Sequence, residues 1–143
     1  MGGVGGTADI RSEDEMRVLI CGGRNYTDAD AVTKHMDAIN DELGGIDLVI
    51  HGGAEGADRL GGEWAARRSI PVCVFPANWK HQGKAAGPIR NAHMLRYGQP
   101  DAVVAFPGGA GTANMIAQAN ERRLAVIEVA APGSALPARV GRG

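Results

Sequence analysis

The chain has 143 residues, enough for one domain with a single core and too few for two ordinary domains. Its apolar share of 44% and charged share of 22% are typical of a globular protein, which excludes disorder for most of the chain. Lys and Arg number 15 against 16 Asp and Glu, so the net charge of -1 excludes a broad polyanion-binding surface and confines any anion site to a local group of residues.

The sequence has no pattern of membrane insertion or export. Its first ten residues, MGGVGGTADI, lack the basic and apolar regions of a signal peptide, and no apolar run approaches the ~20 residues of a membrane span. The two cysteines, Cys21 and Cys73, lie inside apolar runs, which favours free thiols in a reducing compartment over a disulfide. We therefore expect a cytoplasmic protein that makes no membrane contact.

The pattern of strands and helices predicts the fold. Residues 1–15, which mix Gly with charge, and residues 131–143, which carry Pro and Gly without periodicity, are expected to be flexible tails. Residues 16–130 are expected to form the domain. Apolar, β-rich runs predict strands at 17–21, 47–50, 72–75, 102–105 and 125–129. Helical signals separate them at 32–43, 57–65, 88–97 and 112–122. This alternation predicts an α/β, Rossmann-like fold of three layers, with about five parallel strands and helices on both faces.

Glycines gather directly after three of the predicted strands. These glycines are Gly22, Gly23, Gly52, Gly53, Gly56, Gly108, Gly109 and Gly111. In an open parallel sheet the ligand crevice lies outside the carboxyl ends of the strands, where glycine lets backbone N–H groups approach a ligand closely. The helices that follow add partial positive charge at their N-termini. The pattern favours a phosphate site over three tight strand-to-helix turns.

The clearest of these loops is 106–112, Phe-Pro-Gly-Gly-Ala-Gly-Thr, which runs directly into a predicted helix. Pro107 and the glycines of this loop are expected to hold phosphate. Thr112 either caps the helix or donates its hydroxyl to the phosphate. The loop matches neither a P-loop, because no Gly-Lys-Ser/Thr follows, nor the spacing of the dinucleotide fingerprint.

A basic segment, residues 78–91, is the second signal. Arg90 is expected in the first turn of a helix, where a cation opposes the helix dipole unless an anion lies in front of that terminus. Lys84 adds positive charge from the preceding loop, and Asn91 is a candidate for recognising a polar group of a ligand. The alternative is a solvated basic loop with Trp79 as a packing anchor.

Polar side chains also follow the first two strands. Arg24, Asn25 and Tyr26 come directly after a glycine pair, with Asn25 a candidate for bonding a ribose or base edge and Tyr26 for stacking on a base. Asp58 either caps its helix or contacts a ligand. The four histidines are scattered without nearby Cys or carboxylate pairs, so the sequence predicts neither a metal site nor a required cofactor.

Four segments together resemble a known family: 22–26, 51–58, 79–94 and 106–112. They resemble the small stand-alone YspA-like branch of the SLOG superfamily, over nearly all of the body of the chain. That superfamily is similar to the LONELY GUY phosphoribohydrolases, the molybdenum-cofactor carrier proteins and the DNA-processing protein DprA. The resemblance implies a Rossmann-like fold with strand order 3-2-1-4-5, a nucleotide or nucleotide-derived ligand, and association into a homodimer or larger homo-oligomer.

The same resemblance assigns roles to single residues. It makes the loop 106–112 the phosphate loop and Arg90 the counterpart of the arginine beside the scissile bond of the phosphoribohydrolases. Their motif continues to a catalytic glutamate, where this sequence has Met115, and a thioether neither stabilises an oxocarbenium-like centre nor transfers a proton. Glu55 stands where the resemblance implies a basic residue. Either it supplies a relocated carboxylate or the ligand differs.

Three functions are compatible with these patterns. The first is a binding protein or sensor for a nucleotide or nucleotide-derived ligand, which Met115 favours. The second is an enzyme, a hydrolase of the N-glycosidic bond of nucleoside monophosphates, in which Arg90 fixes the phosphoribosyl group and Glu55 or Asp58 stabilises positive charge at the anomeric carbon. The third is DprA-like binding of single-stranded DNA, which needs a basic groove with stacking aromatics and is disfavoured by this composition.

Overall fold

The computed structural model describes residues 14–131 and 139–142. Its sheet has the order β3-β2-β1-β4-β5-β6, and the first five of these strands are parallel. The strands are β1 Arg17–Cys21, β2 Leu48–His51, β3 Val72–Val74, β4 Ala102–Ala105, β5 Ala125–Glu128 and β6 Arg139–Arg142. The helices are α1 Ala29–Glu42, α2 Ala57–Arg67, α3 Trp79–Gln82, the 3-10 turn η2 Gly83–Ala85, α4 Ala86–Gly98 and α5 Ala110–Glu121. The predicted parallel α/β fold and its order 3-2-1-4-5 are confirmed.

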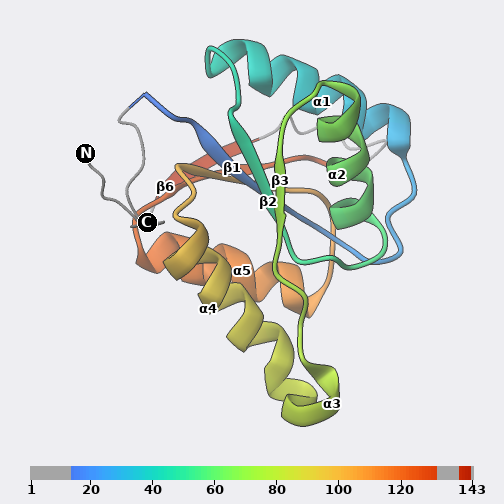
Figure 1. The fold of residues 1–143 in the computed structure, drawn as a ribbon, viewed down its shortest axis with the longest axis vertical. Coiled ribbons are helices and arrows are strands. Elements are labelled where there is room, and N and C mark those ends of the chain that lie inside the picture. Colours follow the sequence, from blue (N-terminus) through green and yellow to red (C-terminus); the bar gives the residue numbers. More distant parts are fainter. Residues whose placement is uncertain (1–13, 132–138, 143) are drawn as a thin grey trace, which may run out of the picture.

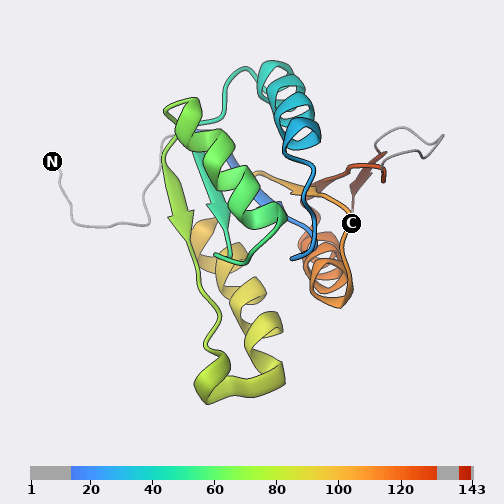
Figure 2. The ribbon, with the colours of Figure 1, turned by 90° about the vertical axis from the view of Figure 1, so that its right-hand side faces the viewer.

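The helices cover both faces of the sheet, with α1 and α2 on one face and α4 and α5 on the other (Figure 1). Successive strand residues point to opposite faces, so Val18 and Ile20 of β1 pack under α1 and α2, while Leu19 and Cys21 pack under α4 and α5. Both faces are buried, which explains why the central strands are apolar throughout. In Figure 2, turned by 90° from Figure 1, α2 lies in front of the sheet.

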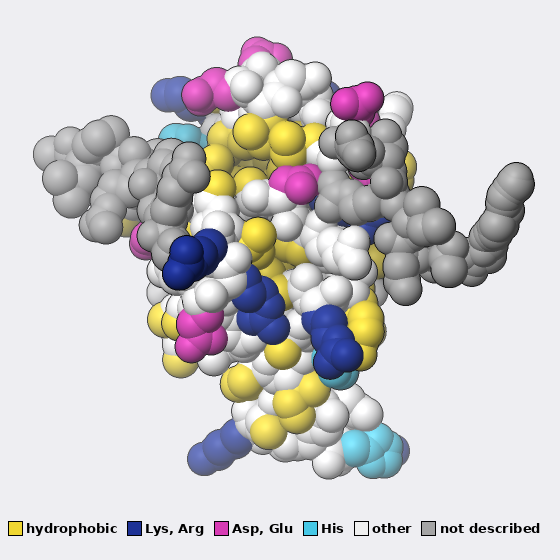
Figure 3. Space-filling model, turned by 90° about the vertical axis from the view of Figure 1, so that its left-hand side faces the viewer, with side chains coloured by type: hydrophobic (Ala, Val, Ile, Leu, Met, Phe, Trp, Pro, Cys, Tyr) yellow, Lys and Arg dark blue, Asp and Glu magenta, His cyan; other side chains and the backbone are white. Residues whose placement is uncertain are grey.

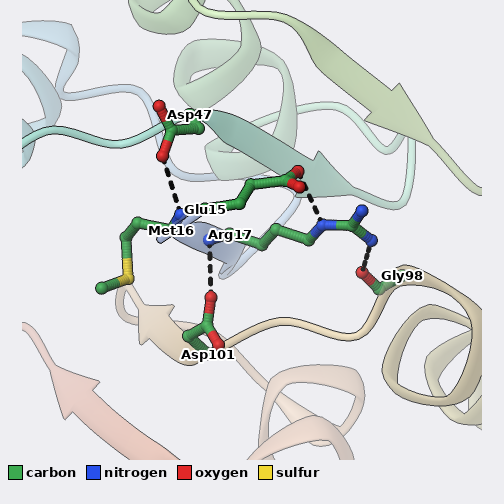
Figure 4. A network of polar contacts seen from close by, with 6 residues as sticks. All are labelled: Glu15, Met16, Arg17, Asp47, Gly98 and Asp101. Carbon is green, nitrogen blue, oxygen red and sulfur yellow. Dashed lines mark hydrogen bonds and ion pairs between the residues drawn. The ribbon is translucent and has the colours of Figure 1, made fainter. Parts of the chain in front are cut away.

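Charged side chains form hydrogen bonds at the amino edge of the sheet, which is opposite the predicted site (Figure 4). The backbone N–H of Met16 donates to Asp47 at 2.8 Å, and that of Arg17 donates to Asp101 at 2.8 Å. The Arg17 guanidinium donates to Glu15 at 2.9 Å and to the carbonyl of Gly98 at 2.9 Å. These bonds join the start of β1 to the segments that precede β2 and β4.

The helices α1, α4 and α5 begin earlier than predicted, whereas α2 begins at the predicted residue. α4 begins at Ala86, so Arg90 lies in its second turn and not in its first, because two small residues before Pro88 already adopt helical conformation. α5 begins at Ala110 with Gly109 as its N-cap, so Thr112 lies inside the helix and does not cap it. α2 has Gly56 as its N-cap, and Asp58 likewise lies inside the helix.

Parts of the two predicted tails lie outside the described residues, namely 1–13, 132–138 and 143. Residues Arg139–Arg142 of the predicted C-terminal tail form β6, which pairs antiparallel with β5 and adds a sixth strand to the expected five. Cys21 and Cys73 are free thiols on strands separated by β2, which confirms the prediction that they do not form a disulfide. None of the described helices is long and apolar enough to cross a membrane.

Candidate functional site

A cleft of about 580 Å³ lies at the carboxyl edge of the sheet, between the loops that follow the strands and the first turns of α4 and α5. Most of the predicted site residues line this cleft. They are Gly22, Gly23, Arg24, Gly52, Gly53, Glu55, Asp58, Arg90, Asn91, Gly109, Gly111 and Thr112. The folded chain therefore brings the three glycine loops and the basic segment together at one site.

Five predicted residues do not line the cleft: Asn25, Tyr26, Lys84, Pro107 and Gly108. The ring of Tyr26 packs against that of Phe106 at 5.5 Å between centroids, and Lys84 is exposed on η2. The carbonyl of Pro107 accepts a hydrogen bond from the N–H of Gly23 at 2.9 Å, which ties the loops after β1 and β4 together. Asn25 is exposed beside these loops.

The glycines around the cleft have two different roles. A Cβ at Gly22 would lie 2.6 Å from that of Ala57, and a Cβ at Gly56 or Gly108 would collide with the facing loop, so packing requires glycine at these positions. A Cβ at Gly109 or Gly111 would meet no heavy atom of the described chain within 4 Å. The fold does not need glycine at these two positions, and the space in front of them is open to the cleft.

The N-terminus of α5 opens into the same space. Gly109 is its N-cap and supplies no side-chain acceptor, while Ala110, Gly111 and Thr112 line the cleft. The first N–H groups of any α-helix have no acceptor within the helix, and they carry the positive end of the helix dipole. This end of the cleft is therefore suited to an anion.

Arg90 of α4 lines the cleft and reaches the loop that follows β2. Its Nη1 donates to the carbonyl of Gly52 at 2.8 Å, and its Nε donates to Oδ1 of Asn91 at 3.1 Å. Among the described residues no carboxylate forms an ion pair with this half-buried guanidinium. A Cβ at Gly52 would overlap the guanidinium, so glycine at that position makes room for it. The N–H groups of Arg90 that take no part in these two hydrogen bonds are available to a ligand.

Asn91 positions the other cleft residues more than it recognises a ligand. Its side chain is buried, and Nδ2 donates to the carbonyl of Gly111 at 3.2 Å and to Asn114 at 3.1 Å. The amide thus joins Arg90 to the first turn of α5. Because both ends of this amide are already bonded within the protein, we assign it the task of holding the arginine against the anion-facing helix.

The two acidic residues of the cleft are in different environments. Asp58 is 5% exposed, and its Oδ2 accepts from the N–H groups of Gly52 at 2.9 Å and Ala54 at 3.3 Å. Burial raises the pKa of Asp58, and these two hydrogen bonds partly oppose that increase. Glu55, in the loop before α2, is exposed and forms an ion pair of 3.1 Å with Arg59 in the first turn of that helix.

His51 supports the loop that Asp58 holds. It is 8% exposed, and its Nδ1 accepts from the N–H of Gly53 at 2.9 Å, so the neutral ring carries its proton on Nε2. Burial lowers the pKa of His51, which favours this neutral form. The described residues contain no group of three His, Cys, Asp or Glu side chains that would hold a metal ion.

Replacing Asp58 with Asn tests its buried charge. A raised pKa in the native state means that the folded protein holds the Asp58 proton more tightly than the unfolded chain does. This carboxyl therefore stabilises the fold at a pH below its ordinary pKa of 3.8. That stabilisation is lost as the pH rises through the pKa of the native state. Asn keeps the acceptor and does not titrate. We expect the free energy of unfolding of Asp58→Asn, relative to wild type, to rise with pH above 3.8, measured by urea denaturation at a series of pH values. A difference independent of pH would contradict the buried, perturbed carboxyl.

Several cleft residues were not predicted from the sequence: Cys21, Ala54, Pro76, Ala77, Trp79, Gly87, Met94 and Ala110. Most are small or apolar, and no charge pattern in the sequence marks them. Burial raises the pKa of the Cys21 thiol, which favours its protonated form. Trp79 is 55% exposed, which contradicts its interpretation as a packing anchor.

Met115, at the position of the phosphoribohydrolase glutamate, faces away from the cleft. Its side chain is fully buried in the core beneath α4 and α5, in the same cluster as Leu19 and Val103. On the face shown in Figure 3, Lys and Arg side chains are separated by hydrophobic and uncharged ones and do not gather into one patch.

The chain is similar in sequence to known proteins. Residues 16–81 match the YAcAr family, described as the YspA, cpYpsA-related SLOG family. The chain is 39% identical over 122 residues to the Gene 61 protein of Mycobacterium phage D29, over 78% of this chain and 94% of the phage protein.

Two solved structures have a similar arrangement of elements. Glycinamide ribonucleotide transformylase 1 from Symbiobacterium toebii has a TM-score of 0.46 at 13% identity, over 85% of this chain and 56% of that one. The enzyme of the same name from Geobacillus kaustophilus has a TM-score of 0.44 at 20% identity, over 79% of this chain and 57% of that one. The chain therefore spans just over half the length of either solved chain.

Proposed function

Because the chain belongs to the YspA, cpYpsA-related SLOG family, we propose that it is a binding protein or sensor whose cleft holds the phosphate of a nucleotide or nucleotide-derived ligand. One observation carries the proposal: the uncapped N-terminus of α5 opens into a cleft beside two glycines that the packing does not require. A phosphate there accepts hydrogen bonds from the first N–H groups of the helix and lies at the positive end of its dipole.

The charge of Arg90 supports the same ligand. Its guanidinium lines the cleft without a carboxylate ion-pair partner among the described residues, and Asn91 holds it against the helix that offers the backbone donors. Charge-assisted bonds from arginine to phosphate oxygens are among the stronger contacts in proteins. The cleft volume of about 580 Å³ falls within the range of small-ligand sites, roughly 300–1,000 Å³.

Titration calorimetry with AMP, GMP, CMP, UMP and ribose 5-phosphate tests the proposal directly. We expect at least one of these phosphates to bind and to raise the melting temperature, because a ligand held only by the native state stabilises it. The matching nucleosides, which lack phosphate, are the control and should bind much more weakly. Equal binding of nucleoside and nucleotide would overturn the assignment of the α5 terminus to phosphate.

Gly111→Ala separates ligand binding from folding. The new methyl group meets no atom of the described chain, and alanine is the better helix former, so the variant should unfold at the same or a higher temperature, with a gain of up to about 0.5 kcal/mol. A helical Cβ points toward the N-terminus of its helix, so this methyl group stands where the phosphate is proposed. We expect the affinity for nucleotide to fall at least tenfold in calorimetry. Unchanged affinity would place the phosphate elsewhere.

The hydrolase alternative rests on a separate observation. Asp58 lines the cleft as a buried carboxyl with a raised pKa, which is a feature of many catalytic acids and bases. Cleavage of the N-glycosidic bond releases free base and ribose 5-phosphate in equal amounts, whereas binding alone releases neither. Release by wild type that is abolished in Asp58→Asn or Glu55→Gln would favour the enzyme over the binding protein.

Two further properties stay predictions. The cytoplasmic location follows from the composition, and self-association follows from the family resemblance. Single-stranded DNA is the least favoured ligand, because the charge is balanced and the chain has few aromatic residues that could stack on bases.

A further inference from the structure

The two ends of the cleft differ in chemistry. One end has the α5 terminus and Arg90, which supply N–H donors and positive charge. The other end, beside α3, is lined by Pro76, Ala77, Trp79 and Gly87, which offer almost no polar side-chain atoms. A ligand that fills both ends must itself carry an anionic group and an apolar, compact group.

Trp79 is the large exposed side chain at the apolar end. It is 55% exposed, similar to Tyr97 at 57%, but Tyr97 lies outside the cleft, beside the ring of His93 and under the guanidinium of Arg96. No aromatic ring or guanidinium of the described chain stacks on Trp79. Its indole therefore leaves a large aromatic surface without a partner beside a ligand cleft.

The position of the indole is set by local structure. Trp79 is the first residue of α3, where the Asn78 side chain caps the turn by accepting from the N–H of His81. A Cβ at Gly87 would lie 3.4 Å from Cη2 of the indole, so the ring lies close to the first turn of α4. The α3 turn projects from the body beside the N-terminal end of α4 in both ribbon views (Figures 1 and 2).

We propose that Trp79 is the stacking surface for the base of the bound ligand, so that the ligand is a nucleoside phosphate and not a simple sugar phosphate. The inference rests on the proposed function, because the phosphate at α5 fixes one end of the ligand and Trp79 receives the other. Every base has a π-face, so stacking on Trp79 contributes affinity without selecting a particular base.

Calorimetric titration of wild type, Trp79→Ala and Trp79→Phe with AMP, GMP, CMP, UMP and ribose 5-phosphate tests this inference. We expect Trp79→Ala to weaken nucleotide binding by about five- to hundredfold and to leave ribose 5-phosphate unchanged, because only the nucleotide carries a base. Trp79→Phe should restore most of the affinity, since a phenyl ring also stacks. Tyr97→Ala removes an equally exposed ring outside the cleft and should change nothing.

Intrinsic fluorescence gives a second readout. Nucleotide, but not ribose 5-phosphate, should quench the emission of wild type, and Trp79→Phe should abolish the quenching while it keeps binding. If wild type binds nucleotide and ribose 5-phosphate equally and Trp79→Ala leaves both unchanged, the stacking inference fails and the phosphate site stands. If neither ligand binds wild type, both proposals fail. A loss of self-association in Trp79→Ala, seen in analytical ultracentrifugation with nucleotide binding unchanged, would reassign the indole to a contact between copies.

Discussion

Replacing Arg90 with alanine is expected to weaken nucleotide binding by about ten- to hundredfold and to remove most of the ligand-induced rise in melting temperature. The guanidinium is the half-buried cation of the cleft, and a charge-assisted hydrogen bond to phosphate contributes about 1.5–3 kcal/mol. The variant also leaves the carbonyl of Gly52 without this donor, so a small loss of stability in the absence of ligand is expected as well. Calorimetry measures the first effect and thermal unfolding without ligand measures the second.

Two matched variants separate the charge from its placement. Arg90→Lys keeps the charge but loses the planar fork, so it should recover only part of the affinity. Gly52→Ala keeps Arg90 and forces its guanidinium to move, because the new Cβ would overlap it, and this variant should therefore resemble Arg90→Ala in binding. Full ligand-induced stabilisation in both Arg90→Ala and Gly52→Ala would show that the ligand binds elsewhere.

The fold was predictable because its signals are local. Apolar runs such as 17–21 and 102–105 indicate strands buried on both faces, and the helical spacing of Val32, Met36 and Ile39 indicates the face that α1 buries. Strand order came from the family resemblance, and the pairing of β1 with both β2 and β4 confirms it. The gathering of glycine loops at one edge then follows from the parallel sheet.

The inner organisation of the site depends on contacts between distant residues. Asn91 bonds the carbonyl of Gly111, 20 residues further along the chain, and no local pattern marks that pair. The same holds for the glycines: Gly108 packs against a facing loop while Gly109 faces open space, although the two are neighbours in one motif. The four-residue helix α3, which carries Trp79, is too short to show a period.

Met115→Glu, which restores the carboxylate of the phosphoribohydrolase motif, is expected to destabilise the protein and to confer no hydrolysis. Position 115 is fully buried among apolar side chains, and an uncompensated buried charge costs about 3–5 kcal/mol. Burial raises the native pKa of such a glutamate above its ordinary value of about 4.3. The loss of stability caused by the glutamate is therefore smallest at a pH below its ordinary pKa, and it grows as the pH rises through the pKa of the native state. Urea denaturation at pH 5 and pH 7.5 should show the larger deficit at pH 7.5.

Met115→Gln has nearly the same shape without a titrating group, so its loss of stability should not depend on pH. Met115→Leu keeps an apolar side chain of similar volume and should cost less than about 1.5 kcal/mol. Wild type and all three variants should release no free base from nucleoside monophosphates above background, because the residue at 115 points into the core and not into the cleft. A Met115→Glu protein that unfolds like wild type at pH 7.5 and releases base would place this side chain at the ligand and make the hydrolase the better account of the cleft.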